Sequence, residues 1–261
     1  MRQFLLPASF NGESELTLRG EDYHYLCRVL RYAERDSFPA VAHDGARYRA
    51  QLVSVGADSC RLSLERSTEQ DWAGAGSPLQ AANSARLPTL TLLQCMPKGQ
   101  GFEAIVRSAT QVGVQHIVPV YSDRTVRRLK SQDDVEKKRE RWERIAREAV
   151  QQSGNPQAPA LYPPRSIDAL PAKEHDATLR LYFHEKPIAQ HSLHGYLKAE
   201  PREVELLIGP EGGLSQRELS SLEQNGFLPA YLGPHVLRTE TAAVYALAAI
   251  QIIALESDSW S

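Results

Sequence analysis

Two short motifs bring glycine, proline, charged and hydroxyl side chains together where an apolar run ends. The first is LLIGPEGGLSQRE, residues 206–218, and the second is YLGPHVLRTETAA, residues 231–243. In each motif a hydrophobic segment enters Gly-Pro and is followed by a helical pattern. Glycine allows close approach of the backbone to a ligand, and proline stiffens the turn. Because ligands bind at the carboxyl ends of strands in open α/β sheets, both motifs are candidate binding loops.

The second motif also carries charge at the start of a helix. Thr239 or Thr241 fits an N-cap, and Glu240 fits a partner of the helix dipole. Arg238 does not fit these structural roles, because a cation before a helix N-terminus opposes the dipole. A polar or anionic ligand would explain it. Spacing alone leaves open whether these turns bind a ligand or only connect strand to helix.

Other common sites are absent from the sequence. There is no GxxxxGKS, no GxGxxG after a strand, and no GxSxG nucleophile elbow. The histidines and the three cysteines, Cys27, Cys60 and Cys95, are scattered without metal-ligand spacing. We interpret the cysteines as small buried side chains in a reducing compartment, and we predict no metal site.

The elements that must position the two motifs alternate between strand and helix. Strands are expected at residues 89–95, 115–120, 179–183, 204–208 and 231–232, and helices at 102–112, 135–152, 215–225 and 239–255. A capping box, Ser215-x-x-Glu218, marks the start of one helix, and Gly113 and Gly226 mark two ends. This alternation predicts an α/β domain with a largely parallel sheet.

The first part of the chain has a different pattern. Short alternating runs at 38–41, 48–53 and 60–64 predict strands, and Gly20–Tyr32 predicts one helix. Residues 68–86 are rich in Ala, Gly, Ser and Gln, which is typical of a linker. We therefore expect a small β-barrel domain at 1–70, a linker at 71–87 and an α/β domain at 88–261.

Composition restricts the class of partner. The 261 residues carry a net charge of -2, so the chain lacks the overall basic excess of many nucleic-acid binders. Any contact with nucleic acid must therefore be local. No run of about 18 uncharged apolar residues and no secretory leader is recognisable, so the expectation is a cytoplasmic protein without a membrane partner.

The motifs GPEGGLSQRE and LGPHVLRTETAA together resemble the SPOUT superfamily of methyltransferases, and more closely the RsmE family. Further matches are HYLCRVLR at 24–31, KGQGFEAIVRSATQVGVQHIVPV at 98–120 and RWERIAREAVQQSGN at 141–155. The resemblance thus extends over nearly the whole chain. This sequence departs from the family pattern at Ser108, Gln111, Asn155 and His235.

The resemblance implies a fold and an activity. The fold is a SPOUT-type parallel sheet with a C-terminal deep trefoil knot, preceded by a PUA-like β-barrel that binds RNA. The activity is methylation of N3 of a specific uridine in 16S ribosomal RNA within the small subunit, with S-adenosylmethionine (SAM) as cofactor. It also implies a homodimer, which the Ala-rich segment 242–255 suits by permitting close helix packing.

The resemblance also assigns residues to SAM, with the loop at His184 and Glu185 as a weaker candidate. The cofactor-binding candidates are Leu207, Ile208, Gly209, Glu211, Gly212, Leu232, Gly233, Leu237 and Arg238. The catalytic candidates are Arg238, Glu240 and Glu211: Arg238 would stabilise charge on uracil, and a glutamate would accept a proton or orient Arg238.

RNA contacts are expected at two basic groups. Arg28 and Arg31 are one helical turn apart. Arg124, Arg127 and Arg128, with Lys130, follow the strand predicted at 115–120. Two other functions stay open: another SPOUT methyltransferase acting on tRNA or a ribose 2'-hydroxyl, and a non-catalytic ribosome assembly factor.

Overall fold

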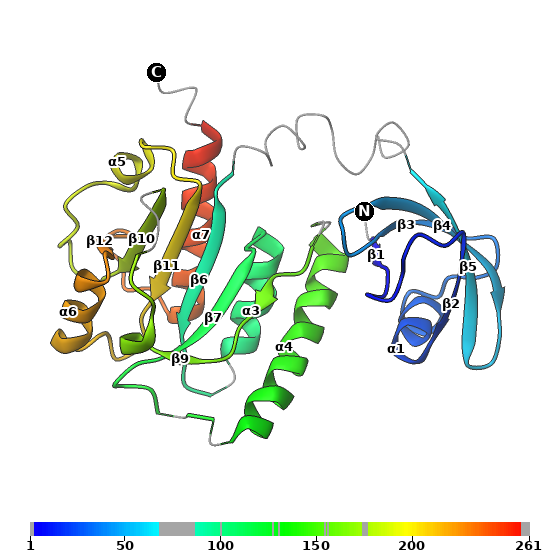
Figure 1. Cartoon of the computed structure of the whole chain (residues 1–261), viewed down its shortest axis with the longest axis horizontal. Coiled ribbons are helices and arrows are strands. Elements are labelled where there is room, and N and C mark those ends of the chain that lie inside the picture. The colour runs from blue at the N-terminus through cyan, green and yellow to red at the C-terminus, as the bar shows by residue number, and fades with distance from the viewer. Residues whose placement is uncertain are drawn as a thin grey trace. The chain divides into compact units, whose positions relative to one another are not determined.

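The computed structural model divides the chain into two compact units. One comprises Met1–Pro78 with Val150–Gln157, and the other Leu79–Ala149 with Ala158–Ser261. The structure describes residues 3–67, 87–99, 101–126, 128–129, 131–153, 155, 157–173 and 177–256. Apart from Leu87, the linker expected at 71–87 lies outside these residues. Each unit is considered by itself (Figure 1).

The first unit is built on a five-stranded sheet of order β1-β3-β4-β5-β2. The strands are β1 (Phe4–Leu5), β2 (Glu15–Arg19), β3 (Ser37–Val41), β4 (Arg47–Val55) and β5 (Ser59–Arg66). β1 and β3 are parallel and the other pairs are antiparallel. In β4, Tyr48, Ala50 and Leu52 are buried in alternation with exposed neighbours, as a sheet with one solvated face requires. The three predicted strands are confirmed, and β1 and β2 were not predicted.

The helix of this unit differs from the prediction of one α-helix over Gly20–Tyr32. A short α1 (Gly20–Tyr23) continues into a π-helix at His24–Val29, and the helical segment ends there. Leu26 is buried in the core of the unit. Tyr32 donates its backbone N–H to the carbonyl of Leu26 at 3.0 Å, and Arg31 before it has a φ of 59°. A left-handed residue therefore closes the helix three residues earlier than expected.

The second unit contains a fully parallel sheet of order β12-β10-β11-β6-β7-β8, with β9 also paired to β7. The strands are β6 (Thr89–Cys95), β7 (His116–Tyr121), β8 (Ala160–Leu161), β9 (Arg165–Ser166), β10 (Thr178–Phe183), β11 (Glu203–Ile208) and β12 (Leu228–Ala230). β11 lies between β6 and β10 (Figure 1). The predicted α/β fold with a parallel sheet is confirmed.

Helices cover both faces of this sheet. They are α3 (Gly101–Val112), α4 (Gln132–Ser153), α5 (Leu193–Leu197), α6 (Gln216–Gln224) and α7 (Thr239–Glu256), with a 3-10 turn at Ile167–Ala169. Leu90 and Leu92 belong to the hydrophobic cluster that α3 and α7 share, whereas Leu93 and Cys95 belong to the cluster under α6. Successive side chains of β6 thus anchor different helices, because strand residues alternate between faces. The capping box of α6 is confirmed.

One strand prediction, Tyr231–Leu232, is wrong. The strand is β12, which ends at Ala230, and Leu232 lies beyond it. Pro229 within LPA argues against a strand, but β12 is an edge strand, where proline is tolerated. The earlier end of β12 leaves Leu232 in a loop at the carboxyl edge of the sheet.

The C-terminal helix α7 is apolar on most of its surface. It packs on α3, α5, β6 and β11, and Ala243, Ala246, Leu247 and Ile250 are buried. Within the described residues, it is the one helix long and apolar enough to cross a membrane by length and composition. That is weak evidence for a span, since core helices have the same composition.

The cysteines need no metal to explain them. Cys60 and Cys95 are buried, as predicted, and Cys27 is half-buried. Burial is the main cause that raises the pKa of Cys60 to about 12, so this thiol stays protonated at neutral pH. Among the described residues, no three His, Cys, Asp or Glu side chains gather as a metal site.

One buried cation, Arg180, forms hydrogen bonds that connect two strands with neighbouring loops. Arg180 on β10 is 4% exposed, and its Nε donates to Glu205 of β11 at 2.7 Å. Its Nη1 donates to the carbonyls of Pro171 at 2.8 Å and Asn225 at 2.9 Å, and the guanidinium lies 4.5 Å from the ring centroid of Phe227. Arg180 therefore joins two strands to the end of α6.

We predict that Arg180→Ala destabilises the second unit by about 3–5 kcal/mol, because Glu205 and two carbonyls lose their partner. The free energy of unfolding in urea measures this. Glu143→Ala is the control: it removes the exposed pair with Arg139 on α4, 3.7 Å apart, and should change stability by less than about 0.5 kcal/mol. If the two substitutions lowered the free energy of unfolding equally, Arg180 would not have the stabilising role assigned to it.

Candidate functional site

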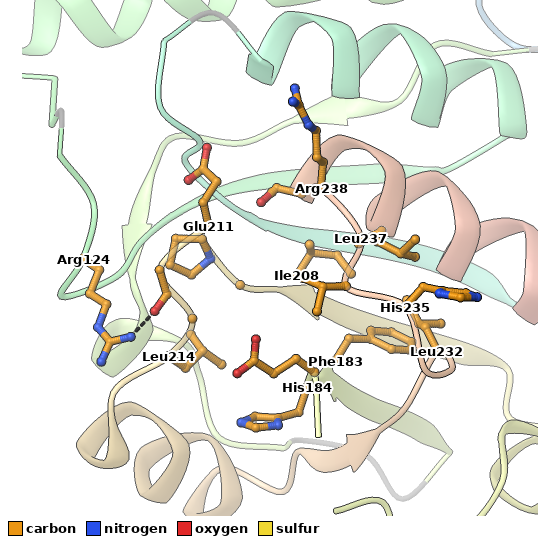
Figure 2. Close-up of a pocket in the computed structure, with 18 of the residues that line it drawn as sticks. Arg124, Phe183, His184, Ile208, Glu211, Leu214, Leu232, His235, Leu237 and Arg238 are labelled. Atoms are coloured by element: carbon orange, nitrogen blue, oxygen red, sulfur yellow. Dashed lines mark hydrogen bonds between the residues drawn. The ribbon is translucent and has the colours of Figure 1, made fainter. Parts of the chain in front are cut away.

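A cavity of about 380 Å³ lies at the carboxyl ends of β10 and β11 (Figure 2). Three loops surround it: the loop after β10, the Gly-Pro loop after β11 and the Gly-Pro loop between β12 and α7. The lining side chains and backbone belong to Arg124, Phe183, His184, Glu185, Ile208, Gly209, Pro210, Glu211, Gly212, Gly213, Leu214, Leu232, Gly233, His235, Val236, Leu237, Arg238, Thr239 and Ala242. The two motifs of the sequence thus meet at one site.

Glycine is required at two positions in these loops. Gly213 has a φ of 73° and its N–H donates to the carbonyl of Pro210 at 2.9 Å, which closes the first turn. Gly233 has a φ of 118° in the second turn. Side chains other than glycine rarely adopt these angles, so both turns depend on the residue type that the motif supplies.

The cavity combines an apolar wall with a charged rim. Phe183, Ile208, Leu214, Leu232 and Leu237 form the wall. Arg124, His184, Glu185, Glu211, His235 and Arg238 supply the charged or titratable groups. A largely apolar hollow of this size with a few polar groups is typical of a site for a small organic ligand.

The structure brings most of the predicted site residues together, with two exceptions. The residues that line the cavity are Ile208, Gly209, Glu211, Gly212, Leu232, Gly233, Leu237 and Arg238. Leu207 does not, because its side chain points to the opposite face of β11 and is buried in the cluster under α6. Glu240 does not either: its Oε1 lies 3.6 Å from where a Cβ on Gly101 would be, toward the start of α3.

Four lining residues were not predicted, since they lie outside the loops 207–213 and 232–238 expected to wrap the cofactor: Phe183, Leu214, Thr239 and Ala242. Ala242 and Thr239 lie in the first turn of α7, and their spacing of three places them on one helix face. Phe183 is the last residue of β10, at the edge where ligands bind. Because a strand was predicted at 179–183, Phe183 could have been named from the sequence as a residue at the ligand-binding edge.

Glu211 and Arg238 extend toward the same side of the cavity (Figure 2). Glu211 accepts the backbone N–H of Lys98 at 2.9 Å through Oε1. Arg238 is exposed immediately before α7. An exposed carboxylate and an exposed guanidinium therefore lie on one side of the cavity, where they can contact a bound molecule.

The loop after β7 is attached to the first Gly-Pro loop. Arg124 lines the cavity and donates to the carbonyl of Gly212. Its neighbour Asp123 accepts from Arg217 and, at 2.6 Å, from the hydroxyl of Ser215. The bond from Arg217, followed by that from Ser215, holds the pKa of Asp123 below its usual range, so this contact persists at neutral pH and is lost on strong acidification.

Glu218 is the buried centre of this attachment. Its Oε1 accepts the N–H of Asp123 and its Oε2 accepts the N–H of Ser215, each at 2.7 Å. One carboxylate therefore caps α6 and fixes the loop after β7 beside the cavity. Arg128 in the same loop lies 5.6 Å from the centre of the Tyr121 ring, and Arg127 lies outside the described residues.

The comparisons with known proteins define the class: the chain is an RNA methyltransferase. The RNA methyltransferase domain family matches residues 84–251, which include both Gly-Pro loops. A solved methyltransferase from Legionella pneumophila, described as in complex with the bound cofactor SAM, is similar over 96% of both chains, with 28% identity and a TM-score of 0.79.

Two named relatives specify the family further. The ribosomal RNA small subunit methyltransferase E of Synechocystis is 35% identical over 94% of this chain and 75% of that protein. The protein of the same name from Bacillus subtilis is 31% identical over 90% of this chain and 88% of its own length. The chain belongs to the ribosomal RNA small subunit methyltransferase E family.

We predict that Glu218→Gln loosens the Gly-Pro loop, because an amide NH₂ would face one of the two N–H donors. The free energy of unfolding should fall by about 1–3 kcal/mol, which is the cost of leaving a buried polar group unsatisfied. Glu223→Gln on the same helix is the control, since its amide oxygen can still accept the Tyr182 hydroxyl that lies 3.0 Å from Oε1. If both variants unfold like the parent in urea, Glu218 does not hold the loop.

Proposed function

We propose that this chain transfers a methyl group from SAM to N3 of a specific uridine in 16S rRNA of the small ribosomal subunit. The observation that carries the proposal is the cavity formed by two Gly-Pro loops in a member of this family. The Legionella relative described with bound SAM supports the choice of cofactor.

The residues of the cavity fit SAM. The apolar wall suits an adenine ring, and the glycines allow close backbone approach. We assign adenine and ribose to the backbone groups of Ile208, Gly209, Leu232 and Leu237. Leu207 then supports the loop from the core rather than touching the cofactor. The cofactor supplies an electrophilic methyl group on a sulfonium.

The residues of the chain must help to remove a proton from the uracil ring. N3 of uracil carries a hydrogen and becomes nucleophilic only as that hydrogen leaves, with negative charge spreading onto the ring oxygens. We assign to Arg238, which lines the cavity, the role of donating to such an oxygen and stabilising the charge. Glu211 lines the cavity and is the preferred group to accept the proton or orient Arg238, whereas Glu240 lies outside the lining, beside the start of α3.

RNA contacts are proposed on both units. In the first unit, which we propose to be a PUA-like RNA-binding domain at 1–70, Arg28 and Arg31 are exposed. In the second, proposed to span 88–261 after a linker at 71–87, Arg128 and Arg127 would contact the RNA backbone. Arg124 would contact RNA only at the cavity, since it donates to Gly212. Phosphate contacts make affinity fall with salt.

The proposed chain topology includes the trefoil knot. Its support is the insertion of β11 between β6 and β10, together with the packing of α7 against β6 and β11. We also propose a homodimer in the cytoplasm. The support is the apolar exposed surface of α7, where Tyr245, Ile252 and Leu255 are 53%, 54% and 37% exposed.

The function is tested by incubating the chain with SAM and unmodified small ribosomal subunits. Mass mapping of the 16S rRNA should find one added methyl group on a single uridine, at N3. Methylation of tRNA or of a ribose hydroxyl would contradict the proposed substrate. Absence of both methylation and SAM binding would favour an assembly factor.

We predict that Arg238→Ala lowers the methylation rate by about 10²–10³-fold, because a donor to the developing charge is lost. Calorimetry with SAM should show that the cofactor still binds. Arg202→Ala is the matched control, since Arg202 is exposed before the amino end of β11, opposite the cavity. Near-normal turnover by Arg238→Ala would remove Arg238 from catalysis.

For the homodimer, Tyr245→Glu should shift the chain to a monomer in sedimentation experiments at micromolar concentration, because it places a charge in an apolar interface. Ile188→Glu changes another exposed apolar residue outside α7 and should leave the dimer intact. A parent chain that sediments as a monomer would contradict the proposal.

A further inference from the structure

A loop of the first unit, Leu30–Asp36, contains two arginines in the left-handed backbone region. Arg31 has a φ of 59° and Arg35 a φ of 76°. Within the described residues, the only other non-glycine residue with positive φ is Glu200. Side chains make this conformation costly, so glycine or asparagine normally occupies it.

The local structure explains the angles but not the residue type. Arg31 follows the π-helix at the position where a left-handed residue, usually glycine, ends a helix. Arg35 is the third residue of a turn in which the N–H of Asp36 donates to the carbonyl of Ala33 at 3.1 Å, and a positive φ there again favours glycine. Both positions thus carry a strain that glycine would relieve.

The backbone of Arg35 is bonded, since its N–H donates to the carbonyl of Leu52 at 2.7 Å and its carbonyl accepts from the Gln51 side chain at 3.3 Å. The side chains of the two arginines, however, gain nothing from the conformation. Both are exposed, and among the described residues no hydrogen bond or ion pair involves the guanidinium of Arg31, Arg35 or the nearby Arg28.

The carboxylates of the loop are engaged elsewhere. Glu34 accepts the N–H of Val55 at 3.2 Å, and Asp36 accepts the N–H of Ala33 at 2.8 Å. The two carboxylates keep their charge but are held by backbone N–H groups, whereas the guanidinium groups of Arg31 and Arg35 are exposed and unbonded within the described part of the chain.

We propose that the loop Leu30–Asp36 binds phosphates of the substrate RNA and that Arg35 is one of its contacts. Strained backbone that is held by its surroundings clusters at functional positions, and here backbone bonds hold Arg35 in place while its guanidinium has no bond to any residue that the structure describes. A guanidinium has the forked donors that match a phosphate. The inference rests on the proposed function, since it takes the ribosomal RNA as partner, and it adds Arg35 to the contacts.

The test separates stability from binding. Arg35→Gly and Arg31→Gly should each raise the melting temperature by roughly 2–5 °C, because the strain is relieved. Each should also weaken binding to protein-free 16S rRNA and to unmodified small subunits about 3–10-fold, and lower the slope of log affinity against log salt by about one.

Two variants serve as controls. Glu200→Gly removes the third left-handed side chain, which is exposed in the other unit, and should raise the melting temperature without weakening RNA binding. Arg35→Lys keeps both the charge and the strain but loses the forked donors, so it should bind RNA more tightly than Arg35→Gly, with no gain in stability. Arg35→Asn, which also tolerates positive φ, repeats the test should the glycine variant fold poorly.

Glycine variants that bind RNA with the affinity and salt slope of the parent overturn the inference, as do variants without a gain in melting temperature. Weaker binding to subunits but not to protein-free rRNA would assign the loop to a ribosomal protein and also overturn it. Normal RNA binding by a parent chain that methylates no uridine would contradict the proposed function alone.

Discussion

The site depends on a backbone constraint at the carboxyl edge of the parallel sheet. Two chain segments leave this edge through Gly-Pro turns, and each contains a glycine with a φ that other side chains avoid, Gly213 and Gly233. These turns direct the chain into α6 and α7 while leaving the space between them open. The hollow is therefore a consequence of turn geometry, and its apolar wall comes from residues such as Ile208 and Leu232 that border the turns.

Other interactions keep this edge in place. Glu218 accepts two backbone N–H groups and thereby couples the capping of α6 to the loop after β7. Arg180 performs a related task at the opposite end of α6, where it binds the carbonyl of Asn225. Both charges are buried: the Glu218 carboxylate accepts two N–H groups, and Arg180 donates to three acceptors, so removing either leaves these groups without their partner. Helix α6, which follows the first Gly-Pro loop, is thus held by polar contacts at both of its ends.

Much of this arrangement was predictable from the sequence, for identifiable reasons. Buried strands such as β6 are short apolar runs, and the start of α6 has a capping box, so local patterns determined them. β12 was misplaced because Pro229 normally argues against a strand, and only its edge position makes proline acceptable. The π-helix at His24–Val29 could not be predicted, since helical periodicity does not distinguish it from an α-helix. Leu207 and Glu240 were assigned to the site by the family resemblance, but strand alternation and helix rotation turn their side chains away from the cavity.

The central claim is that this cavity holds the methyl donor. Calorimetric titration of SAM into the parent chain and into an Ala242→Leu variant tests it most directly, because Ala242 lines the cavity from the first turn of α7 and a larger side chain there would fill it. The account predicts one SAM bound per parent chain and at least a tenfold loss of affinity in the variant, with the melting temperature little changed. Equal SAM affinity in the two proteins would contradict it.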